Sequence, residues 1–283
     1  MTDRGGAGTN GADRVGVPQS AEMKHEIADQ WRHYWQTNTG VSSWDYMSEI
    51  VTETLRSRCG SVSGRHVLEA GCGTGRISLE LARSGASVAC IDTSMEAVAL
   101  TRQTFAASGM PVQAAVASLF ELPFRSVEFD VVWNAGVLEH FSEEERQDAL
   151  VELMRVVKPG GLLVTLNPYK FAVLYRIGKF VSEKLRLWPY GHEAPMSSLA
   201  LAGARLPATS SPEYSTGFFI VLVESLRVSR AFLPVLTTLR GLFIRAHRRS
   251  LGPVIRSADR GLSRMLGGYL LVSSFRKHES AHE

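Results

Sequence analysis

Cysteine, excess charge of one sign and long apolar runs are all scarce in this sequence. Its 283 residues include 3 cysteines, Cys59, Cys72 and Cys90, and no CxxC pair, so we expect neither a disulfide framework nor a metal site. The net charge of +3 is smaller than the basic excess of most nucleic-acid-binding proteins, so no nucleic-acid partner is expected. The apolar stretch 218–223 meets Glu224 long before the roughly 20 residues that a membrane span requires. These absences argue against a membrane span, but not against attachment to a membrane surface.

The composition is that of an ordinary globular chain. Hydrophobic residues make up 45% and charged residues 21% of the sequence, and the mean hydropathy is −0.02, values typical of folded rather than disordered proteins. Residues 1–20 are rich in Gly, Asp and Asn and lack the apolar stretch of a signal peptide. We therefore expect a disordered arm at the start of a cytoplasmic protein.

Short apolar runs alternate with longer helical patterns from residue 65 onward. The runs are HVLEA, SVACID, FDVVWN and GLLVTL, and the helical patterns cover 76–84, 95–108 and 143–157. This alternation predicts βαβ units, and therefore an α/β fold with a mostly parallel sheet that helices cover on both faces. Two further helical patterns, at 21–35 and 46–58, precede it.

The regular alternation stops beyond residue 168. We predict a helix over 169–188, loop and turn over 204–217, amphipathic helices rich in arginine over 218–265 and a closing strand within 267–277. Neither an internal repeat nor a clear linker divides the chain, so one elaborated domain is the simplest interpretation.

A glycine-rich turn follows the first apolar run, in the segment VLEAGCGTG at 67–75. Gly71, Gly73 and Gly75 can adopt positive φ and allow a ligand to approach the backbone closely. The helix that follows offers free N–H groups to polar or anionic ligand atoms. About twenty residues later, Asp92 ends the second run, where it could accept hydrogen bonds from ribose hydroxyls. These features predict a nucleotide-like ligand. The alternative is that the glycines only form a turn and that Asp92 only caps a helix.

The spacing of the glycines bears on which nucleotide this is. A dinucleotide fingerprint is GxGxxG, whereas here Arg76 occupies the position of the third glycine. Glu69, two residues before the first glycine, would repel a pyrophosphate but suits a ligand with ammonium and sulfonium centres. These two residues favour S-adenosylmethionine (SAM) over NAD.

Several further motifs follow in order: IDTS, LPF, FDVVWNAGVLEH and VVKPGGLLV. Together with EAGCGTG they resemble the class I SAM-dependent methyltransferases, in the group that includes ubiquinone/menaquinone-type and natural-product enzymes. The resemblance covers 65–168 and implies a Rossmann-like SAM-binding core. It also implies an N-terminal helical lid over 21–64. Residues 169–283 would supply acceptor-pocket helices, a basic helical insertion and the closing strand of the same domain.

The resemblance implies a set of cofactor contacts. Glu69 and Gly71 would lie near the methionine part, Asp92 would hold the ribose, and Ser118 stands where the family usually has Asp. Ser118 can still hydrogen-bond the adenine amine, but without charge. The whole implied set is Glu69, Gly71, Cys72, Gly73, Gly75, Asp92, Thr93, Met95, Ser118, Leu119 and Asn134. Within it, we expect the Cys72 thiol to pack rather than to react.

Histidine and aromatic residues are the candidates for the acceptor site. His140 follows the fourth apolar run, at the sheet edge where open α/β sheets bind ligands, and could act as a general base. A structural or orienting role is the alternative, and His192 is a second candidate. Trp31 and Tyr34 could touch ligand from the N-terminal helix, or simply pack it onto the sheet. Tyr169 begins the other expected wall, whose apolar content suggests a hydrophobic acceptor.

Arginines dominate the segment 240–264, where Asp259 is the one acid. Interleaved apolar residues make this a basic amphipathic region, which could contact an anionic membrane or an acidic carrier domain. A solvated helix face or an oligomer contact is the plainer alternative. For the whole protein we expect methyl transfer from SAM to a small, rather apolar molecule, within secondary metabolism. The alternatives are a membrane-associated quinone or lipid methyltransferase and a SAM-fold protein that transfers no methyl group.

Overall fold

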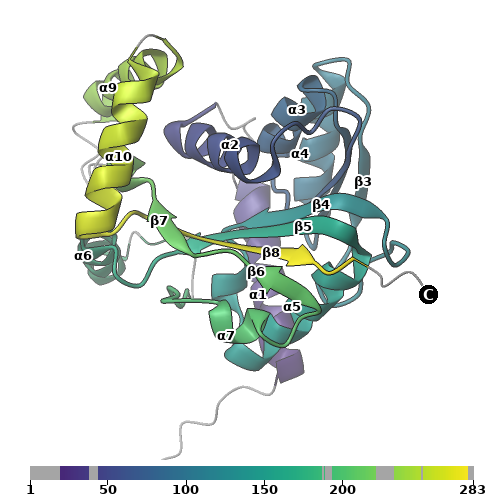
Figure 1. Ribbon diagram of the computed structural model, residues 1–283. Helices are drawn as coiled ribbons and strands as arrows, with labels where there is room; N and C mark the ends of the chain where they lie inside the picture. The colour runs from purple at the N-terminus through teal and green to yellow at the C-terminus, as the bar shows by residue number, and fades with distance from the viewer. Residues whose placement is uncertain are drawn as a thin grey trace, which may run out of the picture.

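The computed structural model describes residues 20–37, 44–186, 188, 193–220, 233–249 and 251–279. Within these ranges the fold centres on one sheet with the strand order β3-β2-β1-β4-β5-β8-β6, and β7 also pairs with β8 (Figure 1). The strands are β1 (His66–Ala70), β2 (Ser87–Asp92), β3 (Gln113–Val116), β4 (Phe129–Ala135), β5 (Val157–Pro168), β6 (Ala208–Ser210), β7 (Tyr214–Thr216) and β8 (Leu270–Lys277).

Strands β1 to β5 run parallel, and β8 lies antiparallel to β5 on one side and to β6 and β7 on the other. The chain goes from β1 outward to β3 and then returns to β4 beside β1. In sheets of this type such a reversal marks where ligands bind, in a crevice that here falls at the carboxyl ends of β1 and β4.

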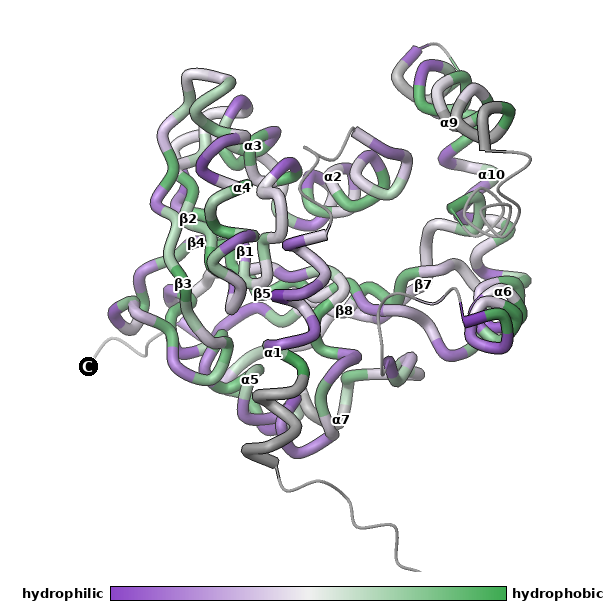
Figure 2. Tube along the Cα trace, turned by 180° about the vertical axis from the view of Figure 1, so that it is seen from behind, coloured by the Kyte–Doolittle hydropathy of each residue, from purple (hydrophilic) through white to green (hydrophobic). Residues whose placement is uncertain are grey.

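Helices cover both faces of the sheet, as the sequence predicts (Figure 1). They are α1 (Ser20–Thr37), α2 (Tyr46–Cys59), α3 (Arg76–Arg83), α4 (Met95–Ala106), the 3₁₀ helix η1 (Leu138–His140), α5 (Glu143–Val156), α6 (Val173–Lys184), α7 (Ala200–Gly203), α9 (Leu233–Arg248) and α10 (Gly252–Leu266). Helices α2, α3 and α4 lie on one face, and α5 and α7 on the other. Seen from behind, α1 crosses the edge of the sheet between α4 and α5 (Figure 2).

The core follows the two-residue repeat of the strands. Leu68 and Val132 point to one face, where they pack against Leu153 of α5. Their neighbours Val67 and Trp133 point to the other face and pack under α2 and α3. Because both faces are buried, the strands are continuous apolar runs rather than alternating ones, which made them visible in the sequence.

The differences from the predicted elements lie mostly in the last third. The segment 204–217, predicted as loop and turn, contains β6 and β7, each of 3 residues, too short to show a periodic pattern. They form because the outer edge of β8 is open for pairing. The helix predicted over 169–188 is confined to α6, and β3 was not predicted. The helical insertion before the last strand is confirmed as α9 and α10. Of the predicted arm, residues 1–19 lie outside the described ranges, and Ser20 already begins α1.

One buried acid anchors the insertion to the core. Asp259 of α10 accepts hydrogen bonds from the backbone N–H groups of Gly217 and Phe219, at 2.9 and 3.2 Å. Arg256, one turn earlier, pairs with Glu53 of α2 at 2.6 Å. Two of the charges in the basic region therefore serve to hold α10 in place.

Candidate functional site

The glycine loop joins β1 to α3 with three left-handed residues. Gly71, Gly73 and Gly75 have φ of 86°, 53° and 64°, a region that side chains disfavour. Space also excludes a side chain, because a Cβ on Gly71 would lie 2.5 Å from Val137 and one on Gly75 2.7 Å from Thr101. The loop therefore needs glycine at these positions, as the sequence predicts.

Helix α1 covers this loop. A Cβ on Gly73 would lie 2.7 Å from the ring of Trp35, so the indole rests directly on the loop backbone. One residue later on α1, Gln36 donates to Glu96 of α4 at 2.9 Å. Trp35, one residue after the predicted acceptor residue Tyr34, therefore touches the predicted cofactor loop.

Asp92 ends β2 beside the loop. Its carboxylate accepts hydrogen bonds from the backbone N–H groups of Gly73 and Ser94, each at 3.0 Å. Burial raises the pKa of this carboxyl, and these two N–H groups act in the opposite direction. The first turn of α4 is capped by Ser94, whose hydroxyl accepts from Ala97 N–H. Asp92 is therefore not the helix cap. Its bond to Gly73 fixes the glycine loop, and its carboxylate lies at the carboxyl edge of the sheet, beside the crevice.

Glu69 lies at the end of β1 and is 5% exposed. Its Oε2 atom has no hydrogen-bond partner among the described residues. Burial raises the pKa of the carboxyl to about 8, although the nearby Ser78 and Arg76 lower it. A buried acceptor without a partner is costly, and a cationic ligand in the crevice would compensate this cost.

Asn134 presents a second group of this kind near the end of β4. It is fully buried, and neither its Oδ1 nor its Nδ2 has a hydrogen-bond partner among the described residues. An amide buried without partners in a native protein calls for an explanation, such as a water or a ligand at the site. The residue stands one position before the end of β4, which pairs with β1, and its contact with cofactor or substrate stays a prediction.

The remaining predicted cofactor residues lie around the same edge but differ in what they present. Thr93 and Met95 are exposed, and Ser118 is half-buried with its hydroxyl accepting from Phe120 N–H at 3.2 Å. Cys72 and Leu119 are buried in apolar clusters. Cys72 Sγ also lies 3.3 Å from Thr101 Oγ1. The side chains of Cys72 and Leu119 thus belong to the hydrophobic core, and only the backbone of these two residues could contact a ligand.

His140 ends η1 and is 4% exposed. Its ring stands edge-on to Trp31 of α1 with centroids 5.2 Å apart, and Trp31 in turn contacts Tyr34 at 5.3 Å. The aromatic face of α1 therefore reaches both the glycine loop and the candidate base. Of the two predicted acceptor residues of α1, Trp31 contacts His140 directly, and Tyr34 contacts Trp31.

Only part of the other predicted wall lies within the described residues. Tyr169 packs against Phe171 with ring centroids 5.5 Å apart and pairs with Met196. His192 lies outside the described residues. Tyr169 is therefore placed next to α6, with its neighbours apolar.

A buried acidic group next to His140 was missed by the sequence reasoning. Glu139 Oε1 lies 3.9 Å from His140 Nε2, and its Oε2 has no partner among the described residues. Burial, and then the nearby Glu193, raise the pKa of Glu139. Glu193 accepts a hydrogen bond from the hydroxyl of Tyr175, and its Oε2 lies 3.6 Å from Lys179 Nζ. The position of Glu139 directly before His140 could have pointed to it. Nothing in the sequence indicated that either residue lies near Glu193 or the α6 residues Tyr175 and Lys179.

No helix within the described ranges is long and apolar enough to cross a membrane. Across the same residues, no group of three or more His, Cys, Asp or Glu side chains is arranged to hold a metal ion.

Residues 67–161, which hold the loop, Asp92, Asn134 and His140, match the family described as methyltransferase domain. This core is a methyltransferase domain. Its sheet, with helices on both faces and a glycine loop after β1, is the Rossmann-like fold of the class I group that the sequence resembles.

Similar sequences carry related names. An O-methyltransferase of Aspergillus sclerotiorum is 29% identical over 136 residues, 46% of this chain and 50% of that protein. The mitochondrial ubiquinone biosynthesis O-methyltransferase of Schizosaccharomyces pombe is 35% identical over 185 residues, 60% of this chain and 63% of that protein. The chain thus spans about half to less than two thirds of the length of these relatives.

Solved structures share the fold at low identity. The 1,6-didemethyltoxoflavin-N1-methyltransferase of Burkholderia thailandensis, with bound S-adenosylhomocysteine, has a TM-score of 0.57 at 14% identity, over 94% of this chain and 93% of that one. The [4+2]-cyclase SpnF has a TM-score of 0.54 at 19% identity, over 84% and 85%. At these identities the likeness shows a shared fold and no more.

Proposed function

We propose that this protein is a SAM-dependent methyltransferase that acts on a small, rather apolar molecule. The observation that carries the proposal is the pairing of a glycine loop with unpartnered buried polar groups at one edge of the sheet. Glu69 Oε2 and the Asn134 amide have no partner among the described residues, and both lie at the ends of the two strands that form the crevice.

The chemistry of these groups fits SAM. Glu69 would face the positively charged methionine part, because a carboxylate in a buried site gains most from a nearby cation. Asp92 would accept from the ribose hydroxyls, and the glycine backbone would follow the ligand without side chains in the way. When bound, SAM supplies an activated methyl carbon, so the protein has only to position the acceptor and take up its proton.

His140 is the residue proposed to take up that proton. It lies at the correct edge of the sheet, and neutral imidazole is a good base near neutral pH. Trp31 and α1 would exclude water from it. Glu139, whose Oε1 lies 3.9 Å from His140 Nε2, would help to orient the ring.

The acceptor is proposed to be apolar, with a hydroxyl group. Both similar sequences named above are O-methyltransferases, which favours methyl transfer to oxygen. The walls from α1 and α6 are rich in aromatic residues, which suits a hydrophobic acceptor such as a polyketide or quinone. Secondary metabolism is the proposed setting.

Calorimetric titration with SAM and S-adenosylhomocysteine, with NAD as a control ligand, tests the cofactor. We expect micromolar binding of the first two and none of NAD. Asp92→Ala should weaken SAM binding more than tenfold, because it removes a charged acceptor of two hydroxyls. Asp130→Asn is the matched control, since Asp130 is bound by His66 N–H and Lys158 at the start of β4, at the opposite edge of the sheet. Equal affinities for the two variants would contradict the proposed site.

Release of S-adenosylhomocysteine tests methyl transfer itself. We expect release only in the presence of an acceptor, and loss of release in His140→Ala with SAM affinity retained. Conversion of a substrate without this product would instead mean that the fold serves another reaction.

A further inference from the structure

The outer face of α6 is apolar. Val173, Ile177 and Phe180 recur at helical spacing and are 57%, 56% and 60% exposed. Phe171, Val181 and Leu185, just before, within and after the helix, are exposed as well. Isolated exposed apolar residues are common, but a continuous set on one helix face marks a contact surface.

The inner face of the same helix is already used. Tyr175 is buried and donates to Glu193, and Lys179 lies over the ring of Trp188 at 4.2 Å. The helix is therefore fixed to the domain by its inner side, and its apolar outer side faces away from the core.

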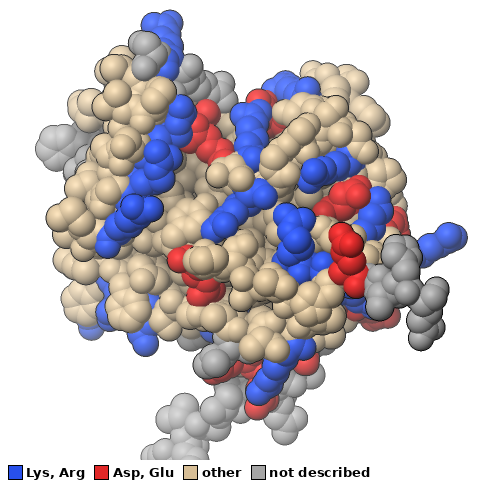
Figure 3. Space-filling model, viewed as in Figure 1, with Lys and Arg blue, Asp and Glu red and all other residues tan. Residues whose placement is uncertain are grey.

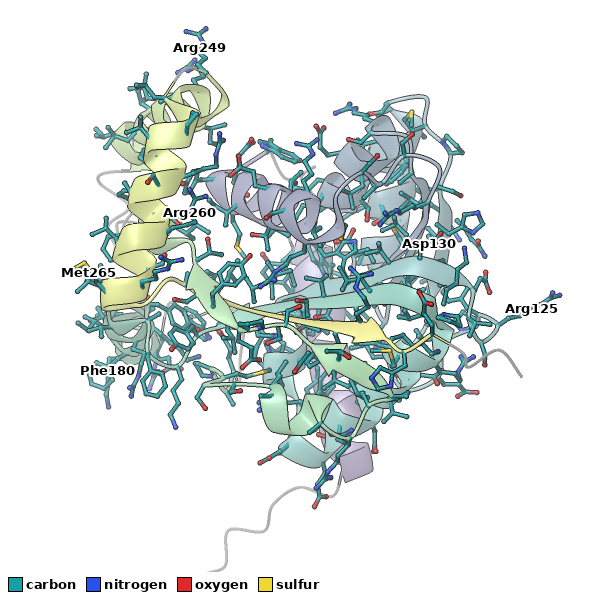
Figure 4. All side chains as sticks on the ribbon, viewed as in Figure 1. Arg125, Asp130, Phe180, Arg249, Arg260 and Met265 are labelled. Atoms are coloured by element: carbon teal, nitrogen blue, oxygen red, sulfur yellow. The ribbon has the colours of Figure 1, made fainter. Side chains whose placement is uncertain are left out.

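The end of α10 extends this surface. Gly267 lies against the backbone of Phe171, since a Cβ there would be 2.4 Å from the carbonyl oxygen of Phe171. The two preceding residues, Met265 and Leu266, are 79% and 49% exposed. Figure 4 places Met265 and Phe180 at the same margin of the molecule, both pointing away from the sheet.

Positive charge surrounds the apolar residues. Between residues 170 and 186 the sequence has five cations and one acid, Glu183, which pairs with Lys179 at 3.1 Å. The other four cations, Lys170, Arg176, Lys184 and Arg186, are exposed. On α10, Arg260 and Arg264 are exposed too, and a row of basic side chains follows that helix in Figure 3.

We propose that α6 and the end of α10 dock on an anionic lipid bilayer. An apolar helix face bordered by basic residues is the pattern of helices that lie in the membrane interface, and anionic lipid would compensate the charge. A symmetric dimer fits less well, because a two-fold contact would bring the same cations of two copies together. The inference does not depend on the proposed methyl transfer.

Docking in this way would direct the protein's crevice toward the bilayer. Helix α6 follows β5 at the carboxyl edge of the sheet, and its inner residue Tyr175 belongs to the group that includes Glu193 and Glu139. One helix therefore has its outer face on the lipid and its inner face at the candidate acceptor wall. An apolar acceptor dissolved in the membrane would have a short route to the site.

Vesicle co-sedimentation of the full chain tests the proposal. We expect binding to vesicles of phosphatidylcholine with phosphatidylglycerol, weaker binding at high salt because charges are screened, and little binding to phosphatidylcholine alone. Ile177→Asp combined with Phe180→Asp should abolish binding. Arg176→Glu combined with Lys184→Glu should lower it at least about twentyfold, since each cation near an anionic surface contributes about fivefold.

Matched controls lie elsewhere on the molecule. Val151 on α5 is 51% exposed, and Arg125 points outward on the side opposite Phe180 (Figure 4). Val151→Asp and Arg125→Glu should bind vesicles like the wild type. Circular dichroism and thermal unfolding should be unchanged in all four variants, because the substituted residues are exposed.

Three outcomes would overturn the inference. The first is a wild-type protein that does not bind the anionic vesicles, and the second is a set of α6 variants that bind as well as the wild type. The third is light scattering that shows a dimer which Ile177→Asp with Phe180→Asp converts to a monomer, without vesicle binding. In that case the surface joins two copies of the chain.

Discussion

Replacing Glu69 by glutamine should stabilise the protein at alkaline pH and weaken its affinity for SAM. Glu69 is buried with one oxygen unpartnered, so ionisation places an uncompensated charge inside the fold. Glutamine has nearly the same shape and remains neutral. The substitution therefore separates the cost of this charge from the packing of the side chain.

The size of the effect follows from the pKa of the carboxyl. Burial raises the Glu69 pKa from 4.5 to about 8, and this difference corresponds to about 5 kcal/mol. Below pH 4.5 the group is protonated in both the folded and the unfolded chain and costs nothing. Between pH 4.5 and 8 the unfolded chain loses the proton first, so the free energy of unfolding falls as the pH rises. The cost is about 3 kcal/mol at pH 7 and reaches its full value above pH 8.

Urea unfolding at several pH values from 5 to 9 measures this. The free energy of unfolding of Glu69→Gln minus that of the wild type should grow with pH and level off above about pH 8. Glu144→Gln, on the exposed side of α5, is the control and should show no such growth. A difference that does not depend on pH, or a Glu69→Gln protein that is less stable than the wild type at pH 9, would refute the reasoning.

The same variant should lose affinity for SAM more than for S-adenosylhomocysteine. Only SAM carries the sulfonium charge, which attracts the carboxylate without a hydrogen bond, an interaction of about 1 to 4 kcal/mol for two charges roughly 4 Å apart. We expect the preference for SAM to fall by about tenfold or more at pH 9 in paired calorimetric titrations. Stability gained with affinity lost is the trade-off expected at a functional site.

Two further substitutions test the loop and the core. Gly73→Ala should lower SAM affinity at least about tenfold in calorimetry, because a Cβ would lie 2.7 Å from Trp35 and must displace α1 or the loop. Gly60→Ala, at a positive φ of 68° but with nothing within 4 Å, is its control and should cost about 2 kcal/mol of stability through backbone strain, without loss of affinity. Leu153→Ala, fully buried between α5 and the sheet, should lower the free energy of unfolding by about 3 kcal/mol in urea. A loss below 1 kcal/mol would mean that this part of the core is loosely packed.

Tertiary contacts account for the parts of the site that sequence reasoning missed. Glu139 and Glu193 lie 54 residues apart in the printed sequence, and their proximity depends on how the segment after α6 returns to η1. Ala194 N–H donates to the carbonyl oxygen of Glu139 at 2.8 Å, a contact with no local signature. The packing of Trp35 on Gly73 is a second example. Helical spacing predicts which face of α1 carries the aromatic residues, but not that this face packs against the glycine loop.

Local chemistry settled the core of this protein before any coordinates. The apolar runs of β1, β2, β4 and β5 are buried on both faces, so each could be recognised from consecutive apolar residues. Gly71, Gly73 and Gly75 stand where only glycine is tolerated, so their spacing predicted the loop. Short strands such as β6 and β7 were decided by the tertiary structure alone, because they exist only through the free edge of β8. The apolar outer face of α6 was decided in the same way. Its residues are the types that a core would use, and only the packing of Tyr175 inward determines which side of the helix remains uncovered.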